Sequence, residues 1–88
     1  MQDNIEQKIK QLMADILRLD PRSVGNETAM DNTPSWDSTN HIILVLALEE
    51  EFLVSFDVPE IEAMTSFRDI IQSINSKTQG TQRSLNPR

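Results

Sequence analysis

Apolar residues recur every three or four positions near the start of the chain, at Ile5, Ile9, Leu12, Met13, Ile16 and Leu17. This spacing places their side chains on one face of a helix, which the pattern predicts over about residues 3–18. Asp20 and Pro21 come next. Because a residue that precedes proline is disfavoured in the helical region, we expect the helix to end just before them.

A long loop and a second helix follow. Residues 21–35 are mostly short and polar, so we expect a loop that is anchored to the core by its apolar side chains, Val24, Met30 and the adjacent Trp36. Asp37 or Ser38 then caps a helix that runs to about Leu53. The core-facing stripe of this helix is Leu44, Val45, Leu48 and Phe52. Residues 42–48 also resemble a buried strand, but leucine and alanine favour helix and the pattern continues into the acidic run that follows.

The rest of the pattern predicts one short helix and one longer helix. Pro59 suits the first position of a brief helical turn that reaches Met64. Thr65 or Ser66 caps a last helix over residues 67–74. The apolar face of that helix holds Phe67, Ile70, Ile71 and Ile74. The predicted fold class is therefore all-α, a bundle of three main helices plus one short helix.

The chain is long enough for one domain. Its 88 residues cannot bury two cores of useful size. We expect residues 1–75 to form this domain as a monomer, because a single core uses most of the apolar residues. Polar residues dominate residues 76–88 around one leucine, Leu85, so we expect a disordered polar tail there.

Charge and composition narrow the function. Eight Lys and Arg against fourteen Asp and Glu give a net charge of −6, which repels nucleic acid and anionic lipid. The absence of Cys excludes disulfides, thiolate zinc sites and cysteine nucleophiles. The first residues do not resemble a signal peptide, and the longest apolar run is too short to cross a bilayer. We therefore expect a cytoplasmic protein that binds no nucleic acid and has no stable membrane insertion.

Few residues offer catalytic chemistry. His41 lies three positions after Ser38, the spacing of a serine–histidine pair on one helix surface, but neither an oxyanion hole nor an orienting carboxylate is evident. We expect His41 at the edge of the core instead. The acids Asp57, Glu60 and Glu62 lack the spacing of a calcium loop, and one His cannot build a zinc site. The sequence predicts no catalytic residue and no metal ligand.

The start of the second helix offers another chemistry. Ser38 lies at a helix N-terminus, where backbone N–H groups and the helix dipole tolerate an attached phosphate diester. An Asp-Ser pair in this place is most often only a cap. The outer side of the helix mixes apolar and acidic residues, namely Thr39, Ile43, Leu46, Ala47 and Glu50. Such a face suits either a docking partner or cover by the long loop.

Three segments together carry a family resemblance: Asp37-Ser38, Ala47-Leu48-Glu49-Glu50-Glu51-Phe52 and Met64-Thr65-Ser66-Phe67-Arg68-Asp69-Ile70-Ile71. The chain resembles the acyl carrier proteins from Trp36 to about Ile74, and more loosely over its first helix. The resemblance implies that a phosphopantetheinyl transferase, with coenzyme A and magnesium, attaches 4'-phosphopantetheine to Ser38. It also implies a carrier and not an enzyme, whose arm holds acyl groups as thioesters for an acyl-loading ligase or synthase and for acyltransferases.

The resemblance also assigns roles to residues. The partner-recognition face would comprise Asp37, Thr39, Asn40, Ile43, Leu46, Glu49 and Glu50. An interior that can lodge a chain would be lined by Val45, Leu48, Phe52, Ile61 and Ile71. Three positions depart from the family pattern. Thr39 stands where the family usually has a leucine, Ile43 stands where it has an acid, and Leu53 stands where it has a glycine. The first two lie on the docking face, which implies partners other than those of ordinary fatty acid synthesis.

Several interpretations of such a carrier stay open. Its cargo would belong to lipid, polyketide or polysaccharide-modifying biosynthesis. With Trp36 ahead of Asp37, the chain resembles a subgroup of free-standing carriers of specialised bacterial pathways. An aminoacyl or peptidyl carrier differs only in cargo and partner. A carrier-like domain that has lost its modification would act instead as an acidic interaction adaptor, for which Ser38→Ala leaves partner binding intact.

Overall fold

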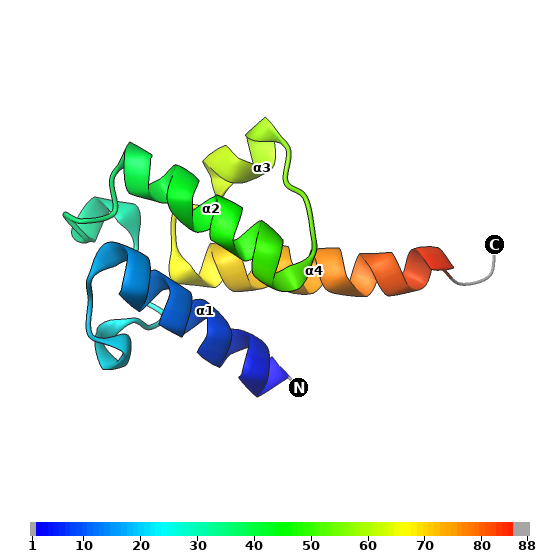
Figure 1. Cartoon of the computed structure of the whole chain (residues 1–88), viewed down its shortest axis with the longest axis horizontal. Coiled ribbons are helices and arrows are strands. Elements are labelled where there is room, and N and C mark those ends of the chain that lie inside the picture. The colour runs from blue at the N-terminus through cyan, green and yellow to red at the C-terminus, as the bar shows by residue number, and fades with distance from the viewer. Residues whose placement is uncertain (1, 86–88) are drawn as a thin grey trace.

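The computed structural model describes the backbone of residues 2–85 and the side chains of residues 5–78. This part of the chain holds the helices α1 (Gln2–Leu17), α2 (Ser38–Phe52), α3 (Val58–Ala63) and α4 (Phe67–Leu85), with short 3₁₀ turns at Pro21–Ser23 and Met30–Asn32. The predicted all-α bundle is confirmed. Figure 1 shows α1 and α2 running alongside each other, with the short α3 where the chain turns from α2 into α4.

The end of α1 is set by the backbone at Arg18. This residue has a left-handed φ of 60°, and the next residue, Leu19, donates its N–H to the Ala14 carbonyl at 2.9 Å. The Asp20 carboxylate then accepts the backbone N–H of Arg22 at 2.9 Å and pairs with its guanidinium. The helix therefore ends within a residue of its predicted boundary.

The long loop is packed as predicted. Val24 and Trp36 are buried, and Met30 packs against the core. The loop also pairs with the α3–α4 connection, which the sequence did not predict. The Met30 N–H donates to the Thr65 carbonyl, and the Phe67 N–H donates to the Thr28 carbonyl, both at 2.9 Å. These bonds fix the loop against the start of α4 and so help to place the start of α2.

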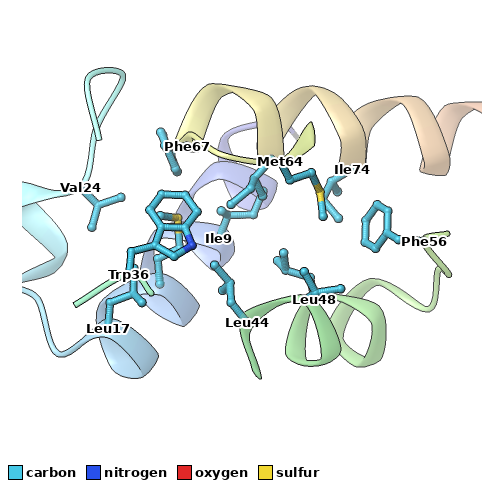
Figure 2. Close-up of a cluster of buried hydrophobic side chains, with 13 residues drawn as sticks. Ile9, Leu17, Val24, Trp36, Leu44, Leu48, Phe56, Met64, Phe67 and Ile74 are labelled. Atoms are coloured by element: carbon cyan, nitrogen blue, oxygen red, sulfur yellow. The ribbon is translucent and has the colours of Figure 1, made fainter. Parts of the chain in front are cut away.

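One apolar core holds the helices together. Its buried side chains come from three helices, the long loop and the connections around α3: Ile9, Met13, Leu17, Val24, Trp36, Leu44, Val45, Leu48, Phe56, Met64, Phe67, Ile70 and Ile74. Figure 2 shows this cluster between the ribbons of α1, α2 and α4. Because each large apolar side chain removed from water contributes about 1.5–3 kcal/mol, this cluster is the main source of stability.

The last helix is longer than predicted. α4 continues to Leu85, so the backbone of residues 76–85 is helical where we expected a disordered tail. The prediction relied on the apolar face, which stops at Ile74, and gave too little weight to Lys, Gln and Arg, which favour helix, and to the absence of proline before Pro87. Residues 86–88 lie outside the described residues, and a domain boundary at residue 75 stays a prediction.

α2 ends at a residue that is poorly suited to its backbone conformation. Leu53 has a left-handed φ of 55°, and its side chain is 89% exposed. A Cβ costs about 1–2 kcal/mol in this region, and glycine avoids that cost. We expect Leu53→Gly to raise the free energy of unfolding by about 1 kcal/mol, measured by urea denaturation. Leu53→Ala is the control, because it keeps the Cβ; equal stability of the two variants would contradict the strain.

Candidate functional site

The site is built at the first turn of α2. Ser38 is the first residue of the helix and is exposed. Asp37 is the cap, because its carboxylate accepts the backbone N–H of Asn40 at 2.9 Å. The Asn40 side chain donates in turn to the Ser35 carbonyl at 2.8 Å, which fixes the loop to this turn. Ser38 is thus not needed as the cap, and its position at the positive end of the helix dipole fits an attached phosphate diester.

His41 serves the core and not a serine nucleophile. It is 7% exposed, which confirms its predicted place at the edge of the core. Trp36 Nε1 donates to His41 Nδ1 at 3.0 Å, and His41 Nε2 lies 2.8 Å from the Ile61 carbonyl oxygen. An indole N–H can only donate, so Nδ1 accepts and Nε2 carries the proton. Both ring nitrogens are engaged, and neither can accept a proton from Ser38.

Part of the predicted recognition face is open to solvent. Asp37, Thr39 and Glu50 are exposed, as are 47% of Ile43 and 57% of Leu46. The long loop therefore does not cover the apolar residues of this face. Exposed apolar and acidic groups lie together on α2, an arrangement that suits transient association with a basic surface.

Two of the predicted recognition residues also brace the structure. Asn40 and Glu49 are half-buried. Asn40 holds the loop, and Glu49 Oε2 accepts the backbone N–H of Phe56 at 2.8 Å. Sequence reasoning missed Leu53 as a surface residue of this region, although it follows the end of the same helix. It completes a shallow hollow on α2 that is lined by Leu46, Ala47, Glu49, Glu50 and Leu53.

Comparison with known proteins decides the family. An acyl carrier protein from Thermosynechococcus vestitus is 36% identical to this chain over 76 residues, which cover 86% of the chain and 94% of the relative. The chain belongs to the acyl carrier protein family. No protein-family model matches the sequence. Membership supports an acyl carrier role together with partner enzymes, in a family that generally carries a phosphopantetheine arm.

Two further features bear on this acyl carrier family member. In the described part of the chain, no helix combines the length and the apolar character that crossing a membrane requires. Among the side chains that the structure describes, His, Asp and Glu residues form no group of three that could hold a metal ion.

The residues expected to line an acyl-carrier interior lie in the core or at its edge. Val45 and Leu48 are buried, whereas Phe52, Ile61 and Ile71 are partly buried and pack against the core. Ile61 belongs to α3, so the position of that helix determines how closely α3 approaches α2. The region where α2 and α3 meet is called the seam below.

Polar contacts at its first turn hold α3 in place. At its N-terminus, Asp57 Oδ1 accepts the Glu60 N–H at 3.1 Å and Glu60 Oε1 accepts the Asp57 N–H at 2.9 Å. The Lys77 ammonium of α4 lies 2.9 Å from Glu60 Oε1 and 5.5 Å from the centroid of the Phe56 ring. Glu60 therefore joins the cap of α3 to α4.

These contacts make part of the stability depend on pH. The Asp57 backbone N–H, and then Lys77, lower the pKa of the Glu60 carboxyl. A depressed folded-state pKa adds stability above the ordinary carboxyl pKa, and this stability is lost as the pH falls through the folded value. We expect Glu60→Gln to melt below the parent at neutral pH and the difference to vanish in acid. Glu62→Gln, an exposed position on α3, is the control; a difference that persists in acid would contradict the ionic contribution.

Proposed function

We propose that this chain carries acyl groups on a 4'-phosphopantetheine arm attached to Ser38. The observation that carries the proposal is the exposed Ser38 at the first turn of α2, where Asp37 takes the capping role. A hydroxyl in this place is accessible to a transferase, and a phosphate attached there lies at the positive end of the helix dipole. When attached, the arm supplies a terminal thiol that holds an acyl group as a thioester. In this proposal the chain contributes no catalytic group.

Attachment requires a phosphopantetheinyl transferase with coenzyme A and magnesium. Ser38 Oγ forms a bond to the phosphorus that bears the pantetheine, the pyrophosphate bond of coenzyme A breaks, and adenosine bisphosphate leaves. The hydroxyl proton passes to a base of the transferase or to water, because both nitrogens of His41 are engaged within the protein. Asp37 keeps the first turn of α2 in place during this step by its bond to Asn40.

Partner enzymes bind the exposed face of α2 in this proposal. Asp37 and Glu50 steer a basic enzyme surface, and Ile43 and Leu46 then add apolar contact. Thr39 lies on the same face. Asn40 and Glu49 support this face by hydrogen bonds to the neighbouring backbone, at Ser35 and Phe56. The partners are an acyl-loading ligase or synthase and acyltransferases, in lipid, polyketide or polysaccharide-modifying biosynthesis.

The intact mass of the chain tests the proposal. After incubation with coenzyme A, magnesium and a broad-range transferase, we expect a mass increase of one phosphopantetheine group. No increase with several transferases would favour the unmodified interaction adaptor. An aminoacyl or peptidyl carrier would show the same increase, and the enzyme that then loads the thiol distinguishes it from an acyl carrier.

A further inference from the structure

His41 joins three segments around the proposed attachment serine. It accepts the Trp36 indole N–H at Nδ1, and Trp36 stands two residues before Ser38. It donates from Nε2 to the carbonyl of Ile61 in α3, across 2.8 Å. His41 itself lies within one helical turn of Ser38. One buried imidazole beside the attachment site therefore bonds to Trp36, just before α2, through one nitrogen and to α3 through the other.

Other contacts hold α3 in the same position. Glu49 of α2 accepts the Phe56 N–H just before α3, and Lys77 of α4 pairs with Glu60 within α3. Behind the seam, Leu48 and Met64 are fully buried in the core cluster. The interior behind α2 and α3 is thus occupied by packed side chains, and polar contacts hold α3 over it.

We propose that His41 determines cargo specificity by acting as a latch, because its hydrogen bond to Ile61 keeps α2 and α3 together. This carrier therefore takes short acyl groups that stay outside the core. The inference rests on the proposed attachment of the arm to Ser38. A long chain that enters between α2 and α3 must separate packed side chains. It must also break the hydrogen bond between His41 Nε2 and the Ile61 carbonyl, which leaves the N–H of a buried imidazole without an acceptor and is unfavourable. An acetyl group has too little apolar surface to drive that opening.

Acyl groups of two lengths test the latch. A transferase with acetyl-coenzyme A or octanoyl-coenzyme A loads each acylated arm directly, and intact mass verifies loading. Amide NMR at Ile61 and Met64, with thermal melting, then reports whether the chain enters the core. In the parent, we expect the octanoyl and acetyl forms to have the same amide shifts at Ile61 and Met64 and the same Tm. In His41→Ala, we expect octanoyl alone to shift these amides and raise Tm, because a bound chain stabilises the folded state.

Two variants complete the comparison. His41→Gln keeps an amide N–H that can reach the Ile61 carbonyl, so we expect it to behave as the parent. His41→Leu fills the space of the imidazole without its hydrogen bonds, so it replaces His41→Ala if the alanine variant does not fold. Gln72→Ala, at an exposed position of α4, is the control, because it replaces a polar side chain away from His41 and should behave as the parent.

The outcomes separate the latch from the function on which it rests. Octanoyl-dependent shifts in the parent would overturn the latch, as would their absence in a loaded and folded variant that lacks the His41 bonds. No mass increase with either acyl-coenzyme A would remove the proposed function, and the cargo inference with it.

Discussion

Ser38→Ala is expected to abolish phosphopantetheine attachment completely while the fold stays intact. The loss is complete because Ser38 Oγ is the atom that bonds to phosphorus, and alanine has no equivalent. The fold stays intact because Ser38 is exposed and Asp37 caps α2. The free energy of unfolding should therefore change by less than about 0.5 kcal/mol. Intact mass and thermal melting measure both effects on the same sample.

Ser35→Ala is the matched control. Ser35 lies three residues before Ser38, but its Oγ is buried and has no hydrogen-bond partner among the described residues. The variant should fold and be loaded to the same extent as the parent. Attachment retained in Ser38→Ala, or lost in a folded Ser35→Ala, would contradict the assignment of Ser38.

Trp36→Ala is expected to lower the free energy of unfolding by about 3–5 kcal/mol, the usual cost of removing a large buried aromatic side chain. The indole is 2% exposed and lies in the core cluster that Figure 2 shows. Its removal also leaves His41 Nδ1 without its donor. Small domains are stable by only about 5–15 kcal/mol in total, so the midpoint of urea denaturation should fall sharply.

Two further variants separate the causes of that loss. Trp36→Phe keeps an aromatic ring but has no N–H for His41, so we expect a loss of about 1–3 kcal/mol from the hydrogen bond, in addition to any change in packing. Ile42→Ala changes a side chain on the neighbouring turn of α2 that is 50% exposed, and its effect should be much smaller. A loss in Trp36→Ala no larger than that in Ile42→Ala would contradict the anchoring role of the indole.

Local patterns predicted the beginnings and faces of the helices well. The spacing of apolar residues in α1 and the Asp37 cap of α2 involve neighbours within a few positions, so their physics is visible in the sequence. The same method ended α4 too early, because the helix continues to Leu85 beyond its apolar face. Burial against a core is only one reason for a helix to continue, and intrinsic propensity is another.

The sequence by itself determined that the chain is a small, acidic, all-α protein with a serine at the start of its second helix and a resemblance to acyl carrier proteins. Only the tertiary structure decided which distant groups meet. His41 and Ile61 are twenty residues apart in the chain, and Glu49 of α2 accepts the backbone N–H of Phe56 just before α3. No local spacing encodes such pairs. They form because buried polar groups need partners, and the fold alone determines which partners are within reach.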